Sequence, residues 1–167
     1  GSSSVKFGFY DREGDAPLVL KGQVEQIGVT PSLTASDGSG NDVAEQSWPA
    51  EGFGHAEAMR AVLETAREQL PGSTVNGVGH RVVHGGTGFA APVEMTGDII
   101  AELEKLSPLA PLHQPHNLAP IKAIAANMPH IRQVACFDTA FHRSQPHLPQ
   151  AFALPREISD AGVRRYG

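Results

Sequence analysis

The feature that most constrains the fold is an amphipathic helical pattern followed directly by a β-branched strand pattern. From Gly54 to Leu70 apolar residues recur at helical spacing, and Pro71-Gly72 ends the pattern. Residues 75–83 (VNGVGHRVV) then form a β-branched run typical of buried strands, and a double glycine follows two residues later. A helix that leads into a buried strand predicts α/β construction.

The flanking sequence predicts further elements of both kinds. Residues 5–10 alternate as a strand, a turn-forming DREGD segment follows, and the apolar run at 17–20 completes a β-hairpin. The remaining predictions are a strand at 24–29, exposed hairpin strands and turns at 32–42, a helix capped by Thr96 that runs through Leu106, a helix from Asn117 through Ala126, and a buried strand at 133–137 that ends at Asp138.

Composition narrows the class of partner. The chain has 167 residues, which is enough for one sizeable core, and a formal charge of -5 without any basic run. This charge gives no electrostatic footprint for a nucleic acid or an anionic membrane. No apolar stretch has the roughly 20 residues that span a bilayer, and no signal-peptide pattern opens the chain, so we expect a cytosolic protein. The single cysteine, Cys136, lies in an apolar run and is predicted to be a buried, inert thiol.

Two strands deliver charged side chains at their carboxyl ends, where α/β folds bind ligands. In the first, alternation places Arg81 and Val83 on one face. A guanidinium can hold a carboxylate or phosphate with two hydrogen bonds, and a valine beside it can contact a small alkyl group, so the pair indicates a small carboxylate ligand. The alternative is a structural ion pair for Arg81 and an ordinary core position for Val83.

The second strand ends at Asp138, with Thr139 and His142 close behind. An aspartate at this place can hold a metal ion, orient a nucleophile or move a proton. The alternative is a residue that caps the following turn.

Two other segments have weaker signals. His113 and His116 have a spacing seen in metal sites, but Pro111 and Pro115 interrupt the segment and no cysteine or glutamate cluster matches it, so hydrogen-bonded loop histidines explain it better. The N-terminal GSSSVK offers backbone donors, hydroxyls and the Lys6 ammonium, which can cradle a phosphate, although a tag or a flexible terminus would look similar. No GxxxxGK[ST] loop is present.

Taken together, four segments in this order resemble the acetate kinase family, which includes propionate and butyrate kinases. They are GSSSVKF, GHRVVHGG, SPLAPLHQPHN and CFDTAFH, and the likeness continues through FALP and GVRRYG to the last residue. The resemblance implies the ribonuclease-H-like α/β superfold of actin, sugar kinases and heat-shock ATPases. Residues 1–167 would be most of its N-terminal, acyl-substrate domain, a mixed sheet with flanking helices that lacks the first strand, and the nucleotide domain would lie beyond this chain.

The resemblance also implies roles for particular residues. Asp138 and Arg81 would be catalytic, with Asp138 the one residue here that could reach a metal ion. The acyl substrate would contact Arg81, Val83, Leu112 and His113, and the ATP phosphates would face Lys6, Ser2 and Ser4. The implied reaction is reversible phosphoryl transfer from ATP to acetate with Mg²⁺ or Mn²⁺, carried out by a homodimer.

The sequence departs from the family pattern at several points. Thr87 stands where many members have glutamate and Gln114 where asparagine is common, and the chain ends before a further signature that supplies a catalytic histidine. We therefore expect these 167 residues alone to be inactive. Two other functions stay open: the same chemistry on propionate or butyrate, and a non-catalytic binding domain of the same superfold.

Overall fold

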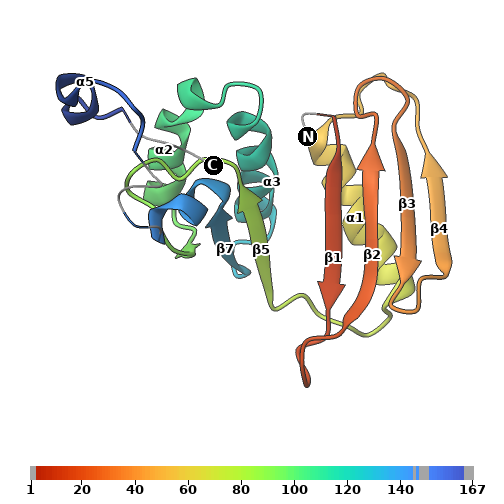
Figure 1. Cartoon of the computed structure of the whole chain (residues 1–167). Coiled ribbons are helices and arrows are strands. Elements are labelled where there is room, and N and C mark those ends of the chain that lie inside the picture. Colours follow the sequence, from red (N-terminus) through yellow and green to blue (C-terminus); the bar gives the residue numbers. More distant parts are fainter. Residues whose placement is uncertain (1–2, 145, 147–150, 164–167) are drawn as a thin grey trace. The chain divides into compact units, whose positions relative to one another are not determined.

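The computed structural model describes residues 3–144, 146 and 151–163. The chain forms two compact units, Gly1–Val75 and Asn76–Gly167, each with a sheet of its own (Figure 1). We describe each unit by itself.

The first unit is built on a four-stranded antiparallel sheet whose strands follow one another in chain order. The predicted hairpin is confirmed, and the 32–42 segment does contain hairpin strands. The prediction of a strand at 24–29 was wrong. Only the first two of these residues belong to β2, because Gln26 and Gly28 have positive φ angles and the chain turns there. The strands are β1 (Val5–Tyr10), β2 (Leu18–Glu25), β3 (Ser32–Asp37) and β4 (Asp42–Ser47).

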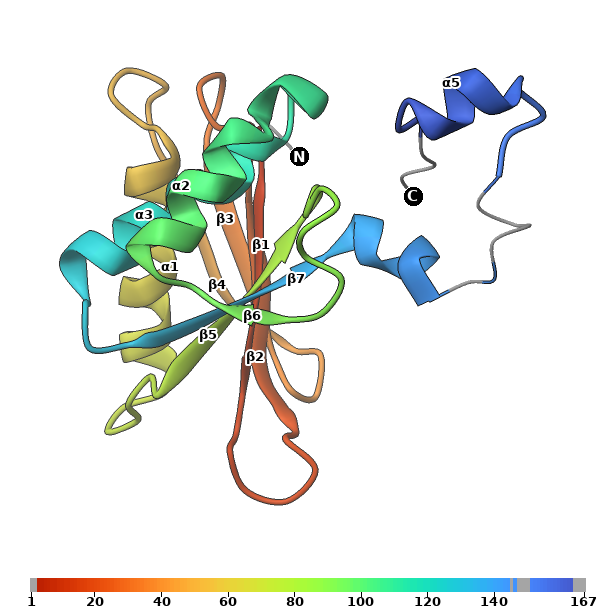
Figure 2. The same ribbon diagram turned by 90° about the vertical axis from the view of Figure 1, so that its left-hand side faces the viewer.

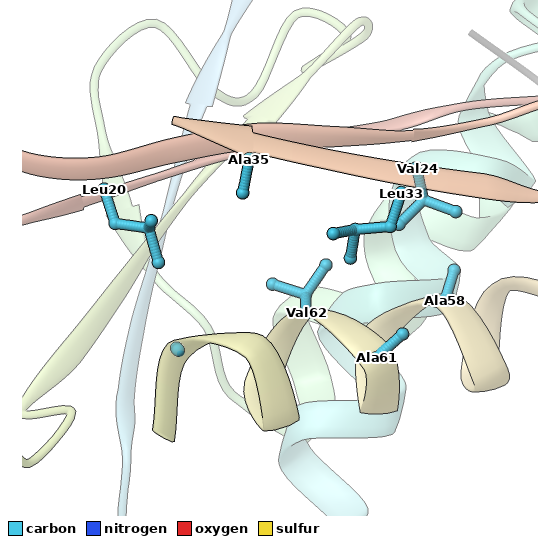
Figure 3. Close-up of a cluster of buried hydrophobic side chains, with 8 residues drawn as sticks. Leu20, Val24, Leu33, Ala35, Ala58, Ala61 and Val62 are labelled. Atoms are coloured by element: carbon cyan, nitrogen blue, oxygen red, sulfur yellow. The ribbon is translucent and has the colours of Figure 1, made fainter. Parts of the chain in front are cut away.

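A single helix, α1 (His55–Gln69), covers one face of this sheet, as the amphipathic pattern predicts (Figure 3). The buried face of the helix is made of small residues and one valine, and it meets buried leucine and valine side chains from β2 and β3. Small side chains on the helix allow close approach to the sheet, and the burial of these apolar groups stabilises the unit. The core residues are Leu20, Val24, Leu33, Ala35, Ala58, Ala61, Val62 and Ala66.

The second unit contains a three-stranded mixed sheet in the order β5-β7-β6. β5 and β7 are parallel, and β6, a short strand that the sequence did not predict, pairs with β7 in the antiparallel sense. Helices α2 and α3 supply the buried residues on one face of this sheet, so the predicted α/β class with a mixed sheet and flanking helices is confirmed. The elements are β5 (Gly77–Val82), β6 (Val93–Glu94), α2 (Gly97–Lys105), η1 (Ser107–Leu109), α3 (Gln114–Asn127), β7 (Arg132–Phe137), η2 (Asp138–Ser144) and α5 (Arg156–Asp160).

The observed first residues of α2 and α3 show which of the predicted helix starts were correct. Thr96 caps α2 as predicted, since its hydroxyl accepts a hydrogen bond from the Ile99 amide. The next helix begins at Gln114 and not at Asn117, because Pro115 is well tolerated in a first turn, where its missing N–H would have no helical partner. Asn117 therefore lies inside α3, and its side chain is available for another contact.

The prediction for Cys136 was wrong, because its side chain is exposed. Burial alternates along β7, with Gln133, Ala135 and Phe137 buried on the helix-covered face, so Cys136 lies on the opposite face. Its partner in the parallel register is Arg81, which is also exposed. Among the described residues no helix is long and apolar enough to cross a membrane.

Candidate functional site

The carboxyl ends of β5 and β7 lie side by side, because the two strands are parallel and in register up to Val82 and Phe137. Beyond them the chain continues into residues 83–86 on one side and into η2 on the other, and Figure 2 shows the end of β7 running directly into that short helix. Both candidate catalytic side chains, Arg81 and Asp138, come from these strand ends. The topology thus brings together two residues that are 57 positions apart.

Arg81 and Asp138 form an ion pair in which the Arg81 Nε lies 2.8 Å from Asp138 Oδ1. The side chains are 84% and 38% exposed, so water screens the pair, and we expect it to stabilise the fold by at most about 1 kcal/mol. Arg81 thus makes an ion pair, but the weak contribution of that pair argues against a purely structural purpose. Within the described chain Asp138 makes no hydrogen bond that caps η2.

The pairing leaves most of the guanidinium available. A guanidinium has five N–H donors, and the Nε bond to Asp138 uses one of them. The other four have no partner among the residues that the structure describes. The Asp138 carboxylate also raises the pKa of Arg81, so the group is cationic at any physiological pH. This edge can accept a bidentate anion.

Val83 follows Arg81 just beyond the last paired residue of β5. It is half-buried and does not belong to the core cluster of this unit, which contains its neighbour Val82 instead. Val83 therefore can offer methyl groups to a ligand beside Arg81, as the alternation predicted.

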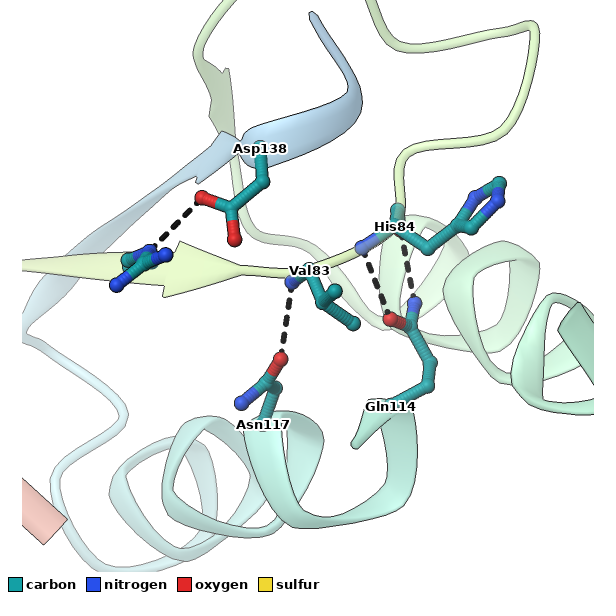
Figure 4. Close-up of polar contacts among 6 residues, drawn as sticks. Val83, His84, Gln114, Asn117 and Asp138 are labelled. Carbon is teal, nitrogen blue, oxygen red and sulfur yellow. Dashed lines mark hydrogen bonds and ion pairs between the residues drawn. The ribbon is translucent and has the colours of Figure 1, made fainter. Parts of the chain in front are cut away.

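Residues 83–86 no longer have a neighbouring strand, and each of their backbone N–H groups donates to a side chain. Figure 4 shows the first two of these contacts, at Val83 and His84. The Val83 amide donates to Asn117 Oδ1 at 2.9 Å, and the His84 amide donates to Gln114 Oε1 at 3.2 Å. Gly85 donates to Thr139 Oγ1 at 3.0 Å, and Gly86 donates to His84 Nδ1 at 2.9 Å. The strand end is thereby held in one conformation.

His84 is a neutral part of this arrangement. Its Nδ1 accepts the Gly86 amide, which requires that nitrogen to be unprotonated. Burial lowers the pKa of His84 below its usual value, in agreement with a neutral ring. The histidine therefore supports the turn and is not a cationic contact for an anion.

The double glycine after His84 has a packing reason. A Cβ on Gly85 would lie 2.7 Å from Cγ of Phe137 and 2.9 Å from the carbonyl oxygen of Phe89. We expect Gly85→Ala to lower the free energy of unfolding by about 3 kcal/mol, because the chain must shift to relieve this overlap. Urea unfolding followed by circular dichroism measures the change. Gly88→Ala is the matched control, since its Cβ would meet nothing within 4 Å, and equal effects of the two changes would refute the packing argument.

The other predicted acyl-site residues, Leu112 and His113, directly precede α3. Both are exposed, with Leu112 72% exposed, and His113 is the residue at the N-terminal cap of the helix. They lie at the same end of α3 as Gln114 and Asn117, whose side chains contact residues 83 and 84. Leu112 is one of several exposed large apolar side chains of the described chain, and it lies two residues before Gln114, whose side chain contacts His84.

The predicted phosphate-binding residues belong to the first unit. Lys6 is exposed on β1 and Ser4 is half-buried, whereas Ser2 lies outside the described residues. The structure therefore groups Arg81, Val83 and Asp138, and it does not test the grouping of Lys6 and Ser4 with them.

Three residues that hold the site were not identified from the sequence as site residues: Gln114, Asn117 and Thr139. Gln114 is fully buried, and its Nε2 donates to the carbonyl oxygens of His84 and Leu103 in addition to the bond from the His84 amide. The available signal was the presence of two side-chain amides, Gln114 and Asn117, within the first four residues of a helix.

A metal ion would find few protein ligands here. Within the part of the chain that the structure describes, no group of three or more histidine, cysteine, aspartate or glutamate side chains could hold one. The fold and the site thus define an α/β protein with an exposed guanidinium at the carboxyl ends of two parallel strands.

Comparison with known proteins identifies the family within this class. The sequence profile of the acetokinase family matches residues 1–167. The acetate kinase of Rhodopseudomonas palustris (strain TIE-1) is 42% identical over 170 residues, which cover the whole chain and 42% of that protein. A crystal structure of Porphyromonas gingivalis acetate kinase superposes with a TM-score of 0.85 at 36% identity, and a propionate kinase from Francisella tularensis with 0.84 at 28% identity. Each match covers the whole chain, and 43% and 42% of the respective structures.

The chain belongs to the acetokinase family. It spans less than half the length of the relatives that it matches. The family resemblance inferred from the four motifs, and the α/β fold that it implied, are therefore confirmed.

Proposed function

We propose that the intact protein is an acetate kinase that transfers a phosphoryl group reversibly from ATP to acetate. The observation that carries the proposal is the exposed Arg81, held by Asp138 at the carboxyl ends of two parallel strands in a chain of the acetokinase family. Its four remaining N–H donors suit a carboxylate or a transferring phosphoryl group. The 42% identity to an acetate kinase supports acetate as the acyl substrate.

The neighbouring residues fit a small acyl group. Val83 and Leu112 present apolar side chains near the strand end, one half-buried and one exposed, and these can surround a methyl group. His113 at the start of α3 would be a polar neighbour of the same pocket. Burial of one methyl group or methylene contributes about 1 kcal/mol, so these contacts would orient the substrate more than they would anchor it.

In the proposed reaction an acetate oxygen attacks the γ-phosphorus of ATP in line with the departing ADP oxygen. A carboxylate is ionised at neutral pH, so the attack requires no general base. The main task of the protein is then to position the reactants and to neutralise charge on the transferring group. Arg81 would do both for the acyl side.

Asp138 would take part on the metal side. Mg²⁺ usually keeps several water ligands and binds through one or two carboxylates together with substrate phosphates, so a single aspartate is a fitting protein ligand. Mg²⁺ or Mn²⁺ would neutralise phosphate charge during the transfer. Only Oδ1 of Asp138 is bonded to Arg81, which leaves its second oxygen for this contact.

The organisation of the intact protein is part of the same proposal. Residues 1–167 would form most of the first, acyl-substrate domain of a two-domain kinase, since the relatives are more than twice as long. β1 and β5 are edge strands of their sheets, which is where a preceding strand could pair. Lys6, Ser4 and Ser2 would face the ATP phosphates, and a cytosolic homodimer is carried over from the family.

The direct test is acyl phosphate formation by the intact protein. With ATP, Mg²⁺ and acetate, propionate or butyrate, hydroxylamine traps each acyl phosphate as a hydroxamate, which forms a coloured complex with added iron(III). We expect the highest kcat/KM with acetate. A higher kcat/KM with propionate would favour a propionate kinase, the activity for which the Francisella protein is named. If none of the three acids gives a product, a non-catalytic binding domain is favoured.

Asp138→Asn separates metal binding from proton transfer. Asparagine retains the shape of the side chain but removes the charge, so we expect at least a tenfold higher Mg²⁺ concentration for half-maximal activity, with an unchanged pH profile. A magnesium titration at several pH values measures both quantities. A shifted pH profile with the Mg²⁺ requirement of the wild type would instead indicate an acid or base.

A further inference from the structure

The structure holds the two sides of the proposed acyl site together with side-chain amides. One side is the end of β5, with Arg81 and Val83, and the other is the start of α3, with Leu112 and His113. Figure 4 shows Asn117 and Gln114 reaching from α3 to the backbone of Val83 and His84, where the sheet no longer supplies partners.

The two amides differ in what they do. Gln114 is fully buried and bonds three backbone groups, two on His84 and one on Leu103, so it acts as part of the core. Asn117 is half-buried, and its side chain makes one described hydrogen bond, which its Oδ1 accepts from the Val83 amide at 2.9 Å. A change at Asn117 therefore affects the Val83 backbone while most of the core stays intact.

The position of Val83 depends on this contact. Val83 is the first residue beyond the last β5–β7 pair, and its N–H has no ladder partner. Without this acceptor the peptide between Val82 and Val83 can tilt, and tilting would shift the Val83 side chain relative to Arg81, which the β5–β7 pairing and Asp138 hold in place. A displacement of about 1 Å is enough to weaken a bound substrate substantially.

We propose that Asn117 is a positioning residue that fixes Val83 beside Arg81 for the acyl substrate. The inference rests on the proposed function, and it does not require Asn117 to contact the substrate. Its signature is selective: binding of the acyl acid weakens, and binding of ATP does not.

The test compares two changes at Asn117 in the intact protein. Asn117→Leu removes the acceptor at nearly constant size, and we expect the KM for acetate to rise about tenfold while the KM for ATP stays within twofold. Asn117→Asp keeps an oxygen acceptor for the Val83 amide. Its added charge would repel anions, and salt screens this repulsion in part because Asn117 is half-buried. At 0.5 M salt we therefore expect the KM of Asn117→Asp for acetate to lie below that of Asn117→Leu measured at the same salt concentration.

The control is Asn127→Leu, at the last residue of the same helix, where Nδ2 donates to the Ala123 carbonyl. It should leave both KM values unchanged. Since KM does not depend on the fraction of folded enzyme, partial unfolding cannot raise the KM for acetate while leaving the KM for ATP unchanged. An acetate KM within twofold of the wild type in Asn117→Leu would overturn the inference, as would an Asn117→Asp variant that stays as poor as Asn117→Leu at high salt.

The experiment separates failure of this inference from failure of the proposed function. An active wild type with an unaffected Asn117→Leu variant overturns the positioning role alone. A wild type that forms no acyl phosphate overturns both.

Discussion

Replacing Arg81 with alanine should lower kcat/KM for acyl phosphate formation by about 10³-fold, a loss of about 4 kcal/mol of transition-state stabilisation. The guanidinium would bind the acyl carboxylate and neutralise charge on the transferring phosphoryl group, and no other described side chain at these strand ends carries a positive charge. Arg81→Lys should recover part of the activity, because a point charge remains while the bidentate geometry is lost. Steady-state kinetics with varied acetate and ATP measure the change.

Arg132→Ala is the matched control for this experiment. Arg132 lies at the start of β7, is exposed, and pairs with the Glu94 carboxylate at 2.7 Å, much as Arg81 pairs with Asp138. It is at the opposite end of the strand from Asp138, so kcat/KM should stay within twofold of the wild type. A loss of less than tenfold in Arg81→Ala would contradict the assigned role.

Replacing Gln114 with leucine should lower the free energy of unfolding by about 3 kcal/mol. The two side chains are similar in size, but leucine leaves the His84 amide and the carbonyl oxygens of His84 and Leu103 without their partner. A buried backbone group without a partner costs about 1–3 kcal/mol, and partial relaxation reduces the sum over three groups. Urea unfolding followed by circular dichroism measures the loss.

Gln69→Leu is the control for Gln114. Gln69 is the last residue of α1, is half-buried, and makes no side-chain hydrogen bond within the described part of the chain. Its replacement should change the free energy of unfolding by no more than about 0.5 kcal/mol. Equal losses for the two variants would show that the amide contacts of Gln114 do not stabilise the fold.

The sequence predicted the features that local patterns determine. Helical spacing identified α1, the Thr96 hydroxyl marked the start of α2, a β-branched run identified β5, and an apolar run identified β7. The choice of Arg81 and Asp138 as candidates followed from one further rule, that α/β folds bind ligands beyond the carboxyl ends of their strands. The structure adds that the two strands are parallel neighbours and that the two side chains form an ion pair.

Features that depend on contacts distant in sequence were missed. Asn117 looked like a helix cap, since asparagine favours that position, but its partner is the backbone of Val83. Cys136 looked buried because its neighbours are apolar, yet side chains on a strand alternate and its own face is open. The two-residue strand β6 is too short to give a periodic signal.

The measurement that tests the central claim most directly follows an oxygen atom. The intact protein is incubated with ATP, Mg²⁺ and acetate labelled with ¹⁸O in its carboxylate, and hydroxylamine then attacks the carbonyl carbon of the product. If an acetate oxygen attacks the γ-phosphorus, that oxygen stays on phosphorus, and the released phosphate is heavier by one ¹⁸O. Unlabelled phosphate would mean that water and not acetate receives the phosphoryl group, and this result would contradict the assignment of an acetate kinase.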